Sequence, residues 1–152
     1  TEWLTWHHYR THDMTDEAFV ARLTEYAAEG GFGDQVPNPE FIAGVVALAE
    51  AGFEQHVVTD RPPIAEADTA WWLDTFAPDI NSLTISRDKT VFTEFSEGPH
   101  FAIDDRVENV QKMVEAGIHA YLLTHPWNVD AALPRVATVG QFVTMMVNNQ
   151  FA

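Results

Sequence analysis

Two adjacent aspartates, Asp104 and Asp105, follow directly after the apolar run 101–103. Neighbouring carboxylates at the end of a strand repel each other unless a cation or strong hydrogen-bond donors lie nearby. Mg²⁺ prefers oxygen ligands and commonly takes only one or two protein carboxylates, with waters completing its octahedron. The pair therefore indicates either a Mg²⁺ site or a cap for the helix expected to begin near Val107. The spacing alone favours neither.

Cationic and hydroxyl side chains follow two other expected strands. Lys89 stands fifteen positions before Asp104 and could neutralise a phosphoryl group, although most lysines are solvated surface residues. Thr59 could donate its hydroxyl to a phosphate oxygen or simply end a strand. Arg61 could bind a phosphate through two nitrogens or pair with an acidic neighbour. Together with Asp60, these residues are the candidates for binding a phosphorylated substrate.

Helical and strand patterns alternate along the chain, which is typical of an α/β fold around a parallel sheet. In such sheets ligands bind beyond the carboxyl ends of the strands, where loops and helix N-termini converge, so we expect the candidate residues to share one edge. Helices are expected at 16–28, 41–51, 65–76, 107–116 and 141–147, and strands at 56–58, 82–85, 101–103, 120–123 and 137–139.

The composition of the chain limits the classes of protein to which it can belong. A chain of 152 residues with 46% hydrophobic and 20% charged residues is expected to form one compact domain. A net charge of −15 argues against binding a nucleic acid polymer, and a phosphorylated substrate would need local cations. The chain has no cysteine, which fits a reducing cytoplasm, and no apolar stretch approaches the roughly 18 residues of a membrane span.

Three segments, in this order and spacing, resemble motifs of the haloacid dehalogenase superfamily. Gln55-His56-Val57-Val58-Thr59-Asp60-Arg61-Pro62 resembles the second motif, Lys89 fits the third, and residues 101–109 followed by Ala116-Gly117 are similar to the fourth. The Asp-Asp-Arg-x-Glu-Asn segment and His125-Pro126-Trp127-Asn128 resemble the 5'-nucleotidase branch, including phage and bacterial 5'(3')-deoxyribonucleotidase-type proteins. The resemblance covers roughly residues 37–143.

This resemblance implies a three-layer Rossmann-like core at residues 37–152 with a small helical cap at 1–36. It also implies a Mg²⁺-dependent phosphomonoesterase that acts on nucleoside or deoxynucleoside monophosphates through an aspartyl phosphate. Thr59 and Lys89 would hold the phosphoryl oxygens, and Asp104 and Asp105 would bind Mg²⁺, with Asp105 as the principal carboxylate. Asn109 departs from the family, since many relatives have another acid at that position.

The family's first motif, a strand that ends in Asp-x-Asp and carries the nucleophile, has no counterpart here. Asp13 and Asp16 are rejected because no apolar strand precedes them. The resemblance places that strand centrally, between the strands that end at Thr59 and at Asp104, and its removal would leave backbone groups unpaired. We expect a further N-terminal segment of about 20–40 residues, or another chain such as the partner of a homodimer, or a rearranged sheet.

The missing nucleophile predicts little or no turnover by these residues alone. It also keeps open an alternative function, a catalytically inactive relative that serves in binding or assembly. Near the start, His8 and His12 stand four apart, but nothing completes a metal site, so aromatic packing or substrate contact by the cap is preferred. Trp71 and Trp72 are expected to pack from a helix against the sheet.

Overall fold

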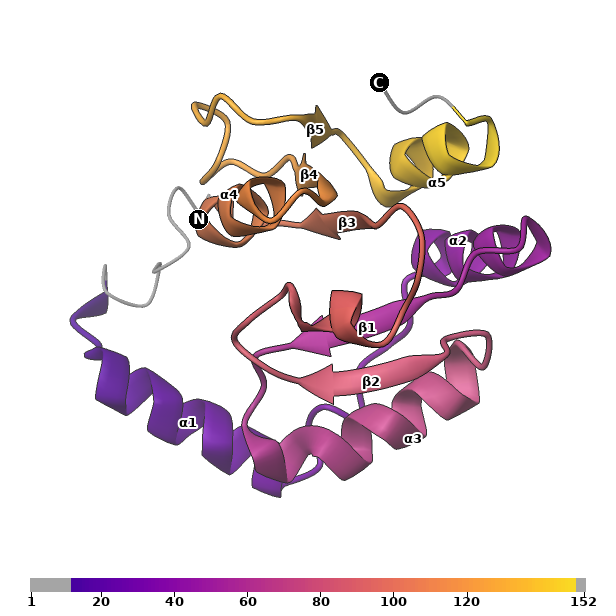
Figure 1. The fold of residues 1–152 in the computed structure, drawn as a ribbon. Coiled ribbons are helices and arrows are strands. Elements are labelled where there is room, and N and C mark those ends of the chain that lie inside the picture. The colour runs from indigo at the N-terminus through magenta and orange to yellow at the C-terminus, as the bar shows by residue number, and fades with distance from the viewer. Residues whose placement is uncertain (1–11, 150–152) are drawn as a thin grey trace.

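The computed structural model describes residues 12–149 (Figure 1), a mixed α/β arrangement with two parallel sheets. One sheet pairs β1 (His56–Thr59) with β2 (Ser82–Ile85). The other has the order β3 (Phe101–Asp104), β4 (His119–Leu123) and β5 (Arg135–Val136). The predicted α/β class with parallel strands is confirmed, and the architecture is compatible with a Rossmann-like fold.

Helices and short 3-10 turns connect the strands, and every expected helix is present. They are α1 (Asp16–Ala28), α2 (Pro39–Glu50), η2 (Pro63–Ala65), α3 (Glu66–Phe76), η3 (Val91–Glu94), α4 (Val107–Glu115) and α5 (Val139–Val147). The expected strand 137–139 is wrong, because Thr138 is the N-cap of α5 and its hydroxyl accepts from the Gln141 amide. The last strand therefore ends at Val136, two residues before Thr138.

Helices cover both faces of the two sheets, which makes three layers. On one face, α2, α3 and α5 supply apolar clusters that include Val45, Leu73 and Met146. On the other face, α4 and η3 supply a cluster that includes Phe92 and Val110. Side chains of successive strand residues alternate between these faces, as strand geometry requires.

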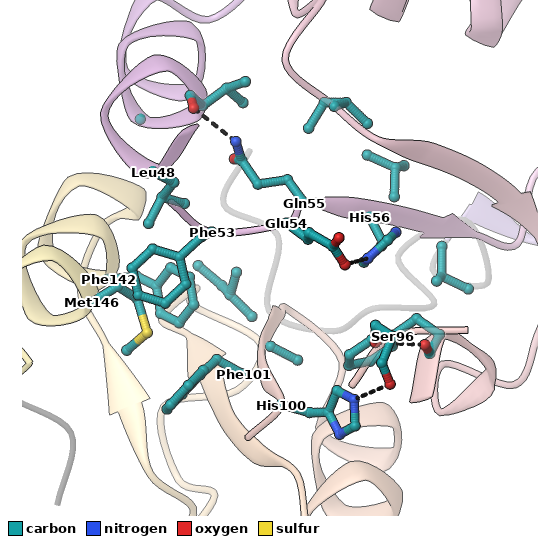
Figure 2. A pocket seen from close by; sticks show the side chains of 18 of the residues that line it. Leu48, Phe53, Glu54, Gln55, His56, Ser96, His100, Phe101, Phe142 and Met146 are labelled. Carbon is teal, nitrogen blue, oxygen red and sulfur yellow. Dashed lines mark hydrogen bonds and ion pairs between the residues drawn. The ribbon is translucent and has the colours of Figure 1, made fainter. Parts of the chain in front are cut away.

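The two sheets do not pair with each other among residues 12–149. No hydrogen-bonded ladder joins β1 to β3, and Figure 1 shows the two strands pointing the same way on opposite sides of a gap. A cavity of about 950 Å³ opens here and is lined by residues of both strands (Figure 2).

At the other end of the fold, α1 lies beside η2 and the start of α3 (Figure 1). Trp72 of α3 packs near β1 and β2, as expected, but the expectation for Trp71 is wrong, because its side chain is 56% exposed. Successive helical residues point about 100° apart, so only one of the two can face the sheet. His8 lies outside the described residues. Within those residues, no helix has the length and apolar character needed to cross a bilayer.

Candidate active site

Lys89 is the centre of the candidate site. It follows β2, and its half-buried ammonium donates hydrogen bonds to the carbonyl oxygens of Val58 (3.0 Å) and Ser86 (3.1 Å). Burial lowers the pKa of Lys89, and the nearby carboxylates of Asp104, Asp60 and Asp105 oppose that shift without cancelling it. The side chain is therefore not a freely solvated surface lysine.

Asp105 is a half-buried carboxylate of the site. Its pKa is raised, first by burial and then by the neighbouring charge of Asp104, while His125 and Arg106 act in the opposite direction. A raised pKa means that the ionised form is disfavoured in the folded chain. A bound cation would offset that penalty.

Asp104 has a different task. Its Oδ1 accepts from the Arg106 amide (2.8 Å), and the Asn109 side-chain amide lies 3.0 Å from both carboxylate oxygens. The carboxylate thus shapes the turn that leads into α4. The capping interpretation is wrong, because the N-cap residue of α4 is Arg106 and no side-chain hydrogen bond in the described part of the chain caps this helix. The side-chain amide of Asn109 is here the hydrogen-bond partner of Asp104.

The fit to Mg²⁺ rests on these two carboxylates. Among residues 12–149, no three His, Asp or Glu side chains gather as a ready metal cage. Mg²⁺ does not require one, because it commonly takes one or two protein carboxylates and keeps several waters. Asp105 would be the main ligand. Asp104 Oδ2, which among residues 12–149 accepts from Asn109 alone, would be the second donor.

Thr59 and Asp60 lie at the same sheet edge. Thr59 ends β1, and its carbonyl accepts from the Ser86 amide (2.9 Å), which joins the loop after β1 to the loop that carries Lys89. Asp60 is exposed and forms an ion pair with Arg87 (3.3 Å), a contact that contributes little to stability. Arg87 is a cation at this edge that the sequence analysis did not single out.

Arg61 makes its contacts away from the other candidate residues. Its guanidinium donates to Thr69 Oγ1 (3.0 Å) and Gln35 Oε1 (3.2 Å) and lies 4.3 Å from the centre of the Phe32 ring. Burial is the main cause of its lowered pKa. These contacts favour neither of the predicted partners of Arg61, a phosphate or an acidic neighbour. Instead, they link the loop after β1 to α3 and to the segment before α2.

Asn128 is a positioning residue whose role sequence reasoning missed. It is 2% exposed, its Nδ2 donates to the carbonyls of Asp105 (2.9 Å) and Leu123 (2.8 Å), and its Oδ1 accepts from the His125 amide (3.0 Å). Beside it, the rings of His125 and Trp127 stack 4.3 Å apart. The sequence signal was available, since a polar loop follows β4, but only the fold shows that this loop holds the backbone of Asp105.

Comparisons with protein-family models, curated proteins and solved structures found no match to this chain.

Proposed function

We propose that the edge formed by Thr59, Lys89, Asp104 and Asp105 binds a phosphoryl group together with Mg²⁺. The protein would then be a phosphomonoesterase of the haloacid dehalogenase type, acting on nucleoside or deoxynucleoside monophosphates. One observation carries this proposal. A half-buried ammonium and a half-buried carboxylate, both with pKa values shifted by burial, reach the same edge from two different sheets.

Each residue has a distinct part in the proposed chemistry. Asp105, with Asp104, would hold the metal, which when bound supplies positive charge at the phosphoryl oxygens. Lys89 would place its ammonium against the same oxygens, and the Thr59 hydroxyl would donate a hydrogen bond to them. In a chain of net charge −15, such concentrated positive charge is what permits an anionic substrate to bind. The attacking aspartate that the resemblance implies is not among these residues.

The test is phosphate release with Mg²⁺, measured on a panel of nucleoside 5'-monophosphates and other phosphomonoesters, using the natural protein that contains this chain. Release that is abolished by a chelator and lowered at least about 100-fold in Lys89→Met and Asp105→Asn would support the proposal. Asp130→Asn is the matched control for Asp105→Asn, since Asp130 is exposed and its substitution changes the net charge equally. Absence of release from every ester would overturn the proposal.

The second candidate function is an inactive relative used in binding or assembly. The contacts of Lys89 and Asp104 favour this second function. Lys89 already donates to two carbonyls, and both carboxylate oxygens of Asp104 already accept hydrogen bonds. Binding of Mg²⁺ and phosphate without turnover of any ester by the natural protein would select this function. For both candidate functions, the expected ligand is a small phosphorylated molecule. The expected location is the cytoplasm.

A further inference from the structure

The loop between β4 and β5, residues 124–134, is a compact turn that is tied to the sheet. At its start, the amide and the hydroxyl of Thr124 both donate to the carbonyl of Val136, each at 3.0 Å. Within the loop, the Ala131 amide donates to the carbonyl of Asn128 (3.2 Å). The loop therefore folds back on itself between the two strands that it connects.

Two side chains of this loop reach the backbone of the candidate metal site. The Asp105 carbonyl accepts from Asn128 Nδ2 (2.9 Å) and from Trp127 Nε1 (3.3 Å). Two donors on one carbonyl restrict the rotation of the peptide group that follows Asp105, and this backbone carries the Asp105 side chain. A ligand side chain has to lie within about 0.5 Å of its productive position, so these contacts bear directly on metal binding.

Arg135 holds the residue that makes the shorter of these two contacts. Its Nη2 donates to the carbonyl of Asn128 (3.2 Å) and to that of Ala131. Arg135 is the first residue of β5, and its Cα is paired with that of Leu122, a fully buried residue of β4. The guanidinium therefore connects a fixed point in the sheet to the loop residue that contacts Asp105.

The acceptors of Arg135 are neutral carbonyls, although the chain has 23 acidic residues and only 8 lysines and arginines. The ion pairs within residues 12–149 involve Arg22, His56 and Arg87, and none involves Arg135. A guanidinium is planar and presents its hydrogens in fixed directions, which suits two carbonyls of one turn. These contacts indicate a geometric task for Arg135 rather than the neutralisation of a carboxylate.

Apolar packing holds only the later part of the loop. Ala131 and Leu133 pack against the cluster that η3 and α4 supply. Within the part of the chain that the structure describes, no side chain of residues 125–130 belongs to an apolar cluster. The part of the loop beside Asp105 therefore depends on polar contacts for its position, and Arg135 supplies the one that fixes the Asn128 carbonyl.

We propose that Arg135 is a positioning residue for Asp105, the main carboxylate of the proposed metal site, and that it acts through Asn128. Arg135 holds the Asn128 carbonyl and so fixes the direction in which the Asn128 side-chain amide meets the Asp105 carbonyl. Arg135 is not itself a ligand. The metal in this proposal rests on the proposed function, whereas the hydrogen bonds from Arg135 to Asn128 and from Asn128 to Asp105 do not.

The test compares Mn²⁺ binding by variants of the natural protein that contains this chain. Mn²⁺ takes the same oxygen ligands as Mg²⁺, and the concentration that half-broadens the Asp105 amide signal in NMR measures its affinity for the site. The variants are Arg135→Met, Asn128→Ala and the double variant, each also unfolded in urea. Arg22→Met is the matched control, because Arg22 is exposed on α1, at the other end of the fold, and its substitution removes the same charge.

We expect the half-broadening concentration to rise about tenfold in Arg135→Met and in Asn128→Ala, since loss of a residue that orients a metal ligand weakens binding about 10- to 100-fold. The double variant should match Asn128→Ala within about twofold, because both residues act on the same carbonyl, whereas independent effects would multiply to about 100-fold. Arg22→Met should change the concentration by less than about twofold, since distant exposed charges are screened by salt.

An unchanged Mn²⁺ affinity in Arg135→Met, with only a lower urea midpoint, would overturn the proposal, because Arg135 would then stabilise the fold without positioning Asp105. Effects that multiply in the double variant would overturn it as well. If Arg135→Met does not fold, Arg135→Lys takes its place, since it keeps the charge and loses the planar fork. Arg135→Lys should raise the half-broadening concentration at least about threefold, and no rise would count against the proposal in the same way.

Amide exchange in the metal-free protein separates a failure of this proposal from a failure of the proposed function. The His125 amide donates to Asn128 Oδ1 (3.0 Å), so it should exchange at least about tenfold faster in Arg135→Met than in the unsubstituted protein. If Mn²⁺ does not broaden the Asp105 signal even in the unsubstituted protein, the proposed metal site fails. The exchange of His125 then decides the positioning role, and an unchanged rate in Arg135→Met would overturn it.

Discussion

Replacing Asn128 with alanine tests how the loop after β4 holds the backbone of Asp105. The substitution removes three hydrogen bonds and leaves the Asp105 and Leu123 carbonyls and the His125 amide without this partner. A buried group that loses its partner costs about 1–3 kcal/mol, but these partners are only partly buried, so water can reach some of them. We expect a total loss of about 2–4 kcal/mol, a large share of the 5–15 kcal/mol that stabilises a typical domain.

Urea unfolding at pH 7 and 25 °C measures this loss. With a slope near 2 kcal/mol per M, the midpoint should fall by about 1–2 M. Asp130→Ala, in the same loop but exposed, is the control and should change the free energy of unfolding by no more than about 0.5 kcal/mol. Equal midpoints for the Asn128 and Asp130 variants would refute the reasoning, because the loop would then hold Asp105 without the amide of Asn128.

Three further substitutions test the packing and the charges. Asp105→Asn should raise the melting temperature at neutral pH by up to about 3 °C, because it removes a carboxylate whose raised pKa marks an unfavourable buried charge. Calorimetry measures this temperature, and an unchanged or lower value would contradict the prediction. Leu122→Ala should cost about 2–5 kcal/mol in urea unfolding, since Leu122 is 0% exposed, and a cost below 1 kcal/mol would show that β4 does not lie in the core. Gly44→Ala should lower the free energy of unfolding by about 1–3 kcal/mol, because the new Cβ would lie 2.9 Å from Val143 Cγ2 between α2 and α5. The control Val46→Ala, on the exposed side of α2, should have little effect.

The sequence predicted the helices and most strands because their periodicity is strong and their ends carry clear signals. Gly52 and Gly117, for example, have positive φ angles and terminate α2 and α4 as expected. The last strand was misplaced because Thr138 reads equally well as a strand residue and as a helix cap. Only the tertiary context, with β4 pairing at Arg135 and Val136, decides between them.

The candidate site was predicted in part. Lys89, Asp104 and Asp105 do converge, because the carboxyl ends of parallel strands meet at one edge. Arg61 could not be placed from sequence, since its partners Gln35 and Thr69 belong to other segments of the fold. The separate tasks of the two aspartates were equally hidden, because adjacent residues at the end of a strand point in different directions.

Binding of Mn²⁺ followed by NMR tests the central claim most directly, because Mn²⁺ accepts the same oxygen ligands as Mg²⁺ and broadens the signals of nearby nuclei. At low Mn²⁺ concentration, we expect selective broadening of the amides of Asp104, Asp105 and Lys89, reversed by excess Mg²⁺. The broadening should be lost in Asp105→Asn and kept in Asp130→Asn. Broadening spread evenly over the acidic surface, or the same pattern in both variants, would contradict a metal site at this edge.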